Sequence, residues 1–447
     1  MAQLTIHYEH QADSPDVIVL GGGTAGVIAA CAAAREGKRV LLLEREYALG
    51  GTATLSLTTP RMTNHMPQIV SCSSLAGLLQ AEMERDGFGG DTYFADPQMT
   101  KLYLERLCAR FGVEILYGAD LVSAAMDGQR IAEVIVSTSE GMLGFHAPVF
   151  IDCTGNAQLA LLSGCETACG YEGENQPMSL RFSVGGVDIP RVYGTLNEWG
   201  YRFGGDHFPM EFYSLWREEA FNPFTKLLRK GVEAGALTQQ DGSYIQAYHH
   251  PSMGRDTLWF NCPEAGHILN AVSARSITRM VLYSRESAQR IFSFLKASFP
   301  GFENSYIQSF ADIPGIRESR RLVGEYVVSE ADVRARRRFD DAIAQTAYPI
   351  DIHNEKNLVL IHMEPGEYYE IPYRCMLPRS VSNLLVAGRC VSSTFAAQSS
   401  MRIQLTCMAL GEAAGIAAAM SGDVHAVDGA QVRKRMMAHG ATFAVTA

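Results

Sequence analysis

The segment from Asp16 to Arg45 constrains the fold of this chain more than any other. It contains an apolar run, DVIVL, the turn Gly21–Gly26, a small-residue run, VIAACAAAREGK, and a second apolar run, RVLLLER. This order predicts a strand, a glycine turn, a helix and a second strand that ends at an acid, Glu44. A G-x-G-x-x-G turn alone is weak evidence in a chain with 41 glycines, but the complete unit predicts a bound dinucleotide.

Each glycine of this turn has a physical role. Gly21 permits the tight turn, Gly23 has no Cβ to block a pyrophosphate, and Gly26 lets the helix pack closely on the strand. The free N–H groups at the start of the helix, together with its dipole, offset the charge of a diphosphate. Glu44 can accept hydrogen bonds from an adenosine ribose, and its charge disfavours the 2′-phosphate of NADP. The alternative is an empty α/β unit whose glycines serve packing alone.

Composition excludes several classes of protein. The 447 residues predict about two or three domains, and the net charge of -10, without a strong basic run, argues against a nucleic-acid partner. The apolar stretch 408–420 carries Glu412 and is too short to span a bilayer, so we expect a buried helix and no membrane partner. The ten cysteines include no C-x-x-C pair, which favours reduced thiols in the cytoplasm. Cys165 and Cys169 lack accompanying histidines, so no metal is expected.

The rest of the chain predicts a discontinuous first domain. Residues 97–111 have helical periodicity, and residues 113–152 alternate like a three-stranded meander followed by a buried strand. Aromatic segments punctuated by Gly and Pro then indicate an α+β domain, before a strand at 383–387 and a helix at 403–421. We therefore expect an α/β fold with these parts: a Rossmann-like domain at 14–170 and 378–424, an inserted α+β substrate-binding domain at 171–377, and a C-terminal helical tail at 425–447.

Several motifs together resemble those of a known family. They are the Asp16–Arg45 unit, GGTAT, FIDCTGNAQLA, MSLRF, PGIRESRRLVGEY, YPIDIHN, IPYRCMLP and NLLVAGRCVSSTFAAQSSMRIQLTCMALGEAAGIAAA. The chain resembles the FAD-dependent oxidoreductases of the glutathione-reductase-like FAD-binding superfamily over residues 15–440. The resemblance implies that the dinucleotide is FAD and that the Rossmann-like domain is of the glutathione-reductase type.

The resemblance also implies roles for individual residues. Gly21, Gly23, Thr24, Ala25 and Gly26 would hold the diphosphate, Glu44 the adenosine ribose, and Arg45 and Val122 would lie at the adenine. Gly50, Gly51, Thr52 and Ala53 would lie along the ribityl chain and isoalloxazine, Thr154 and Gly155 near the pyrophosphate, and Gly388 and Arg389 beside the ribityl chain. Many relatives have an aspartate where this chain has Arg389, which puts that ribityl contact in doubt.

The segment Met401-Arg402-Ile403-Gln404 begins the last long helix that we expect. Free N–H groups and the helix dipole at this point would face the flavin N1–C2=O edge, where negative charge collects on reduction. Arg402 would strengthen that effect, and a salt bridge elsewhere on the surface is its alternative role.

Candidate catalytic residues lie late in the chain. His353 suits proton transfer near neutrality, with a purely structural histidine as the alternative. Tyr373 and Arg374 could orient an oxygen-bearing or carboxylated substrate, or serve packing between domains. At most one of the adjacent His249 and His250 is expected to reach the site. We interpret the arginines of IRESRR, residues 317, 320 and 321, as ion pairs between domains.

The leading functional hypothesis is an FAD enzyme that oxidises a small polar metabolite by hydride transfer to flavin N5. No cysteine pair accompanies GGTAT, and no second complete dinucleotide unit is present, so we expect electrons to pass to oxygen, a quinone or a protein carrier. One alternative is a flavin-dependent reductase, for example of a C=C bond, fed by an external reductant. Another is a non-catalytic dinucleotide-binding protein. The oligomeric state is not predicted.

Overall fold

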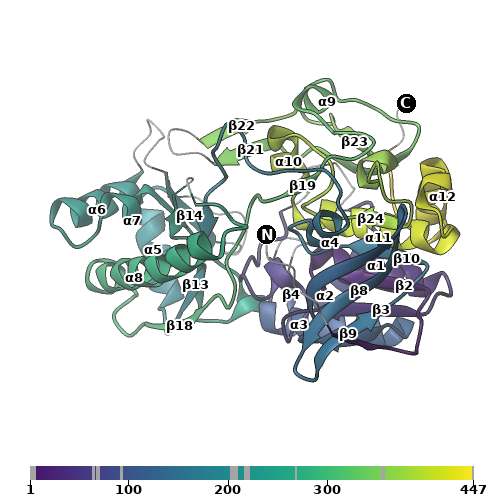
Figure 1. The fold of residues 1–447 in the computed structure, drawn as a ribbon. Helices are drawn as coiled ribbons and strands as arrows, with labels where there is room; N and C mark the ends of the chain where they lie inside the picture. Colours follow the sequence, from purple (N-terminus) through teal and green to yellow (C-terminus); the bar gives the residue numbers. More distant parts are fainter. Residues whose placement is uncertain are drawn as a thin grey trace.

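A five-stranded parallel sheet lies in one half of the structure, on the right in Figure 1. The computed structural model describes residues 7–62, 66, 71–90, 94–201, 210–215, 222–266, 269–353 and 358–444. The strand order is β24-β10-β2-β3-β6, and all four pairings are parallel. The strands are β2 (Val17–Leu20), β3 (Val40–Glu44), β6 (Glu114–Tyr117), β10 (Val149–Asp152) and β24 (Leu384–Val386). Because β24 pairs with β10, the sheet joins the two ends of the chain.

Side chains of this sheet alternate between two hydrophobic cores, as expected for strands buried on both faces. Val17 and Val19 of β2 pack toward helices, whereas Ile18 and Leu20 pack toward a second sheet. The helices are α1 (Thr24–Arg35), α2 (Ser74–Arg85), α3 (Pro97–Phe111) and α11 (Gln404–Met420). The second sheet has the order β1-β9-β8-β7, built from β1 (Glu9–His10), β7 (Asp120–Asp127), β8 (Arg130–Thr138) and β9 (Gly141–Phe145).

Two predictions for this half of the chain are confirmed. The helix at 97–111 is α3, which begins after Asp96, whose side chain accepts from the Met99 N–H, and ends at Gly112 with φ of 72°. The meander is β7, β8 and β9, whose neighbours are antiparallel. The short helix α10 (Phe395–Met401) was not predicted, because its small residues show no helical periodicity.

Glycines let α1 and α11 pack unusually closely. A Cβ on Gly411 would lie 2.2 Å from the Ala25 carbonyl oxygen, and one on Gly415 would lie 2.2 Å from that of Ala29. Both helices are rich in alanine, so their backbones approach each other and few side chains separate them. The first and the last long helices of the Rossmann-like unit therefore form one packed layer.

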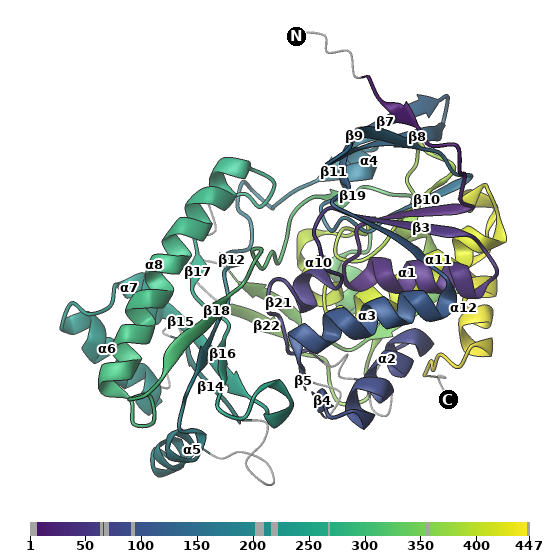
Figure 2. The same ribbon diagram turned by 90° about the horizontal axis from the view of Figure 1, so that it is seen from below.

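A separate antiparallel sheet lies beside this unit (Figure 2). Its order is β14-β15-β16-β13-β18, and α5 (Ile189–Glu198), α6 (Pro223–Glu233) and α8 (Ala274–Ser298) accompany it. The strands are β13 (Phe182–Gly185), β14 (Met210–Leu215), β15 (Tyr244–His249), β16 (Leu258–Phe260) and β18 (Tyr306–Phe310). Its own core is aromatic, with Phe182 stacked on Phe260 at 4.7 Å between ring centroids. The proposed domain boundaries at 170 and 377 remain predictions.

Two short two-stranded antiparallel sheets follow later in the chain. They pair β20 (Ala342–Thr346) with β23 (Tyr369–Pro372), and β21 (Ile350–His353) with β22 (Leu358–Ile361). Strand β21 lies against α10, where the Asp351 N–H donates to Ser399 Oγ at 3.0 Å. This contact fixes the strand that carries His353.

Within the described ranges, we find no single helix that is both long and apolar enough to cross a membrane. Helices α10 and α11 meet that criterion only as a pair, by length and composition, and the chain bends by 92° between them. Both helices are mostly buried in the protein.

Candidate active site

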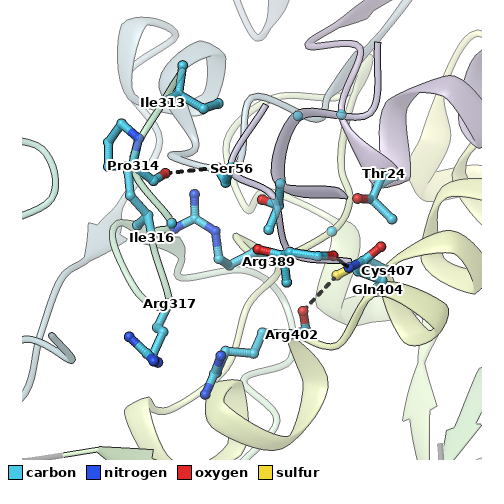
Figure 3. Close-up of a pocket in the computed structure, with 18 of the residues that line it drawn as sticks. Thr24, Ser56, Ile313, Pro314, Ile316, Arg317, Arg389, Arg402, Gln404 and Cys407 are labelled. Carbon is cyan, nitrogen blue, oxygen red and sulfur yellow. Dashed lines mark hydrogen bonds between the residues drawn. The ribbon is translucent and has the colours of Figure 1, made fainter. Parts of the chain in front are cut away.

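A cavity of about 500 Å³ lies where the parallel sheet meets the antiparallel one. Its lining comes from the Gly21 turn, the segment 313–317, strands β14 to β16, strand β21 and the start of α11. Figure 3 shows Thr24, Ser56 and Gln404 around the same space, although they come from opposite ends of the sequence. Its position past the carboxyl ends of the parallel strands is where open α/β sheets bind ligands.

The glycine turn is packed on one side and open on the other. Gly21 has φ of +92°, and a Cβ there would lie 2.6 Å from the Cys153 carbonyl oxygen. A Cβ on Gly26 would lie 1.8 Å from the Gly21 carbonyl oxygen. By contrast, a Cβ on Gly23 would meet nothing within 4 Å. Only Gly23 therefore faces open space, as a backbone that a ligand approaches closely must do.

Glu44 lies at the end of β3 and is held by main-chain donors. The Gly22 N–H donates to Oε2 at 2.5 Å, and the Glu46 N–H donates to Oε1 at 2.8 Å. Burial raises the pKa of Glu44, although these two hydrogen bonds oppose the shift. Arg45 lines the cavity beside it and forms an ion pair with Glu46 at 3.0 Å.

The start of α11 presents polar atoms without protein partners. Gln404 Nε2 donates to the carbonyl oxygens of Thr58 at 2.7 Å and Pro60 at 3.3 Å. Its buried Oε1 has no hydrogen-bond partner in the described part of the chain, and neither does Arg402 Nε. Buried polar atoms normally have hydrogen-bond partners. The Gln404 Oε1 acceptor and the Arg402 Nε donor are therefore candidates for hydrogen bonds to a ligand at this helix end.

His353 lies between two carboxylates. Its Nδ1 is 2.9 Å from Glu264 Oε1, and its Nε2 is 3.2 Å from Asp351 Oδ1. Burial and the nearby Arg317 lower the pKa of His353, but Glu264 and Asp351 outweigh them, so the pKa is raised overall. The same arrangement lowers the pKa of Asp351, because His353, Arg402 and Arg317 offset the effect of its burial. The two carboxylates therefore stabilise the protonated form of this ring.

Two arginines neutralise the carboxylates on either side of His353. Arg317 Nη2 is 2.7 Å from Glu264 Oε1, and Arg402 Nη2 is 3.1 Å from Asp351 Oδ2. The Tyr244 ring meets the imidazole edge-on, at 5.4 Å between centroids and 77° between planes. The contacts with Glu264 and Asp351, together with the Tyr244 ring, thus hold the His353 ring in one orientation.

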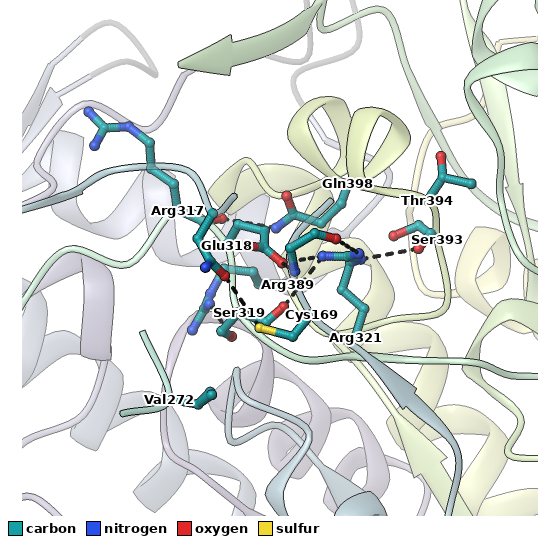
Figure 4. Close-up of polar contacts among 12 residues, drawn as sticks. Cys169, Val272, Arg317, Glu318, Ser319, Arg321, Arg389, Ser393, Thr394 and Gln398 are labelled. Atoms are coloured by element: carbon teal, nitrogen blue, oxygen red, sulfur yellow. Dashed lines mark hydrogen bonds and ion pairs between the residues drawn. The ribbon is translucent and has the colours of Figure 1, made fainter. Parts of the chain in front are cut away.

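A second polar network holds Arg389 near the sheet. Its Nη1 donates to Ser319 Oγ at 2.7 Å, and its Nη2 donates to Asn156 Oδ1 at 3.1 Å. Arg321 and Glu318 form a buried ion pair next to it (Figure 4). The segment 317–321 is thereby attached to the turn that contains Gly155.

Comparison with known proteins identifies the family. The family model described as FAD dependent oxidoreductase matches residues 16–436. This chain belongs to that family. It is a flavin-dependent oxidoreductase, and FAD is its cofactor.

Individual relatives are more distant. A thiamine thiazole synthase from Desulfosudis oleivorans is 30% identical over 150 residues, which span 32% of this chain and 56% of that relative. A flavin-dependent brominase has the same fold, with a TM-score of 0.50 at 11% identity over 95% of this chain and 83% of that one. A p-nitrophenol 4-monooxygenase from Pseudomonas putida aligns with a TM-score of 0.49 at 13% identity, over 97% of this chain and 87% of that one.

The cavity of this flavin-dependent oxidoreductase fits FAD. Gly23 leaves room for a diphosphate beside the start of α1, and the Glu44 carboxylate is fixed where a ribose would need an acceptor. The unsatisfied Gln404 Oε1 and Arg402 Nε match the pyrimidine edge of an isoalloxazine, which carries both an N–H donor and carbonyl acceptors. At the ring end, the fit therefore rests on two buried atoms that lack partners in the described part of the chain.

The structure brings most of the predicted site residues to this cavity. The following line it: Gly21, Gly23, Thr24, Ala25, Glu44, Arg45, Gly51, Thr52, Thr154, Gly155, His353, Gly388, Arg389, Arg402 and Gln404. Gly26, Gly50, Ala53 and Met401 do not line it, although each lies next in sequence to a residue that does. Val122 does not line the cavity, whereas its neighbour Leu121 does, since successive side chains of a strand point to opposite faces.

Tyr373 and Arg374 do not line the cavity. The Tyr373 hydroxyl is buried and donates to the Val424 carbonyl oxygen at 2.8 Å. The Arg374 guanidinium pairs with Asp341 at 2.9 Å at the surface. Both therefore have structural partners elsewhere. His249 and His250 also lie outside the cavity lining.

Several lining residues were not anticipated from the sequence. They are Arg181, Tyr244, Arg317 and Asp351, and Glu264, which pairs with His353, was not anticipated either. A signal existed for Asp351, because it precedes His353 by two positions and so shares its face of a strand. We expected Arg317 to form an ion pair between domains, but its partner Glu264 lies in the same predicted segment, 171–377. Arg181 and Glu264 gave no local signal, because only the tertiary fold brings them to His353.

Proposed function

We propose that this enzyme oxidises a small polar metabolite, with His353 as the group that takes up the substrate proton. When bound, FAD supplies the two-electron acceptor for the hydride that leaves the substrate carbon. The observation that carries the proposal is the place of His353, a titratable group fixed by two carboxylates in the cavity that the glycine turn opens into.

Residues of the chain divide into two roles in this proposal. The backbone at Gly21 to Ala25 would hold the diphosphate, and Glu44 the ribose. Arg402 and Gln404, with the start of α11, would face the ring edge and favour negative charge there. Tyr244, Glu264 and Asp351 would keep the His353 ring in one orientation.

For oxidation, His353 must accept a proton from a substrate hydroxyl or amine, so only its neutral form is competent. Its raised pKa therefore predicts that substrate oxidation becomes faster as pH rises through that pKa. We expect the electrons to leave to oxygen, a quinone or a protein carrier.

One observation favours reduction as a second candidate. An imidazolium held between Glu264 and Asp351 is suited to donate a proton to a substrate such as a polarised C=C bond. For that reaction the pH dependence has the opposite sign, because the rate falls as His353 loses its proton.

The test is anaerobic mixing of the FAD-loaded enzyme with alcohols, 2-hydroxy acids and amines while the oxidised flavin band is recorded. We expect at least one donor to bleach the band, and His353→Asn to slow bleaching by about 10²- to 10⁴-fold while FAD is retained. His439→Asn is the matched control, since His439 also contacts a carboxylate, Glu36, but lies outside the cavity.

Each other outcome contradicts part of the proposal. Bleaching by NADH or NADPH alone would favour the reductase. Equal bleaching rates in His353→Asn and the unsubstituted enzyme would remove His353 from the chemistry. The absence of bleaching by every donor would favour a non-catalytic dinucleotide-binding protein.

A further inference from the structure

Arg181 lies in the cavity without a carboxylate partner. It follows β12 (Met178–Ser179) and precedes β13, and its Nε donates to Asn261 Oδ1 at 2.8 Å. Its Nη1 donates to Thr58 Oγ1. In the described part of the chain, its Nη2 has no hydrogen-bond partner, and no acid pairs with its charge. Burial of an unpaired guanidinium is costly, so such a residue is a candidate for ligand binding.

The neighbouring charges increase this cost. Burial lowers the pKa of Arg181, and the like charges of Arg317 and Arg402 lower it further. Those two arginines are already matched by Glu264 and Asp351, respectively. Among the other acids that line the cavity, Glu211 accepts a hydrogen bond from Gln246, Glu44 accepts from backbone N–H groups, and Glu46 pairs with Arg45. Arg181 is thus the cation of this group that an anionic ligand would balance.

Two chains of contacts place Arg181 between the flavin end and His353. Thr58 accepts from Arg181 through its hydroxyl and from Gln404 through its carbonyl oxygen. On the other side, Asn261 Nδ2 donates to the Tyr244 hydroxyl at 3.0 Å, and the Tyr244 ring contacts His353. Arg181 is therefore connected through Thr58 to Gln404, and through Asn261 and Tyr244 to His353.

We propose that the substrate carries a carboxylate, which the Arg181 guanidinium binds while the oxidisable carbon lies beside His353. The assignment rests on the function proposed above. A guanidinium matches a planar carboxylate through paired N–H donors. One uncompensated positive charge also suits a singly charged carboxylate better than a dianionic phosphate.

The experiment measures binding of unreactive probes to the FAD-loaded enzyme by titration calorimetry and by the flavin difference spectrum. The probes are acetate, propionate and benzoate, the neutral amides of the same acids, and inorganic phosphate. We expect at least one carboxylate to bind the unsubstituted enzyme more tightly than its amide and than phosphate. Arg181→Gln should weaken this binding at least tenfold, and Arg181→Lys should weaken it less.

Arg279→Gln is the matched control, because it removes the same charge from an exposed position on α8. Thr58→Val removes one group that orients Arg181 and should weaken carboxylate binding to a smaller extent than Arg181→Gln. It provides the decisive comparison if Arg181→Gln does not fold. The visible flavin spectrum and FAD retention report folding independently of probe binding.

The outcomes separate this inference from the proposed function. The carboxylate site would be overturned if acids and amides bound equally, if no carboxylate bound, or if phosphate bound more tightly. Unchanged affinity in Arg181→Gln or in Thr58→Val would also overturn it. If a neutral donor bleaches the flavin equally in Arg181→Gln and the unsubstituted enzyme, oxidation stands and the carboxylate assignment fails. If carboxylates bind through Arg181 but no donor bleaches the flavin, the site stands and the oxidation proposal fails.

Discussion

Two glycines of the same turn have different roles, one in cofactor binding and the other in folding. A Cβ on Gly26 would overlap the Gly21 carbonyl oxygen, whereas one on Gly23 would enter open space. We therefore expect Gly26→Ala to destabilise the fold by about 3 kcal/mol or more, because backbone atoms must move. Gly23→Ala should unfold at nearly the same denaturant concentration as the unsubstituted apoprotein but bind FAD at least about tenfold more weakly. Equal effects of both changes on unfolding would contradict this division.

Asp351 sets the protonation of His353. Asp351→Asn removes a negative charge 3.2 Å from Nε2, so the pKa of His353 should fall. The midpoint of the pH profile of kcat/KM should then move to lower pH, whether the rate rises or falls with pH. Asp341→Asn is the control, since Asp341 pairs with Arg374 away from the cavity. If the midpoint does not move in Asp351→Asn, then Asp351 does not set the pKa of the group that the pH profile reports.

At the scale of elements, the close contact between α1 and α11 should reverse the usual effect of a Gly→Ala substitution in a helix. Gly→Ala inside a helix usually stabilises by about 1 kcal/mol. Gly77→Ala on α2 should follow that rule, because its Cβ meets nothing within 4 Å. Gly411→Ala should instead destabilise by about 1–3 kcal/mol, since its Cβ would lie 2.2 Å from the Ala25 carbonyl oxygen. Urea unfolding of both variants measures the difference in sign.

The same comparison explains what could be predicted from the sequence. Local patterns placed β2, α1, α3 and the meander, because each depends on spacing within a short segment. Most predicted cofactor residues reached the cavity for the same reason, since they belong to turns. The polar group around His353 could not be predicted as a unit, because Arg181, Glu264 and Arg317 are far apart in the sequence and only the tertiary fold brings them together. Short helices such as α10 lack a periodic signal.

At the scale of the molecule, FAD should act as a link between distant parts of the chain. The lining of its cavity comes from residues near the start, the middle and the end of the sequence. Ligand that binds only the folded form at 100 times its Kd adds about 2.7 kcal/mol to the free energy of unfolding. We expect that increase in urea titrations with and without FAD, and a single shared transition in its presence. Stabilisation of one part alone, seen as a split transition, would contradict the link.

The pairing of β24 with β10 and of α11 with α1 has a consequence for biosynthesis. While the ribosome is still adding residues before 384, the edge of β10 and the alanine face of α1 have no partner. The nascent nucleotide-binding unit must wait for β24 and α11, and its apolar surface stays exposed meanwhile. We therefore expect coenzyme capture to follow synthesis of β24 and α11.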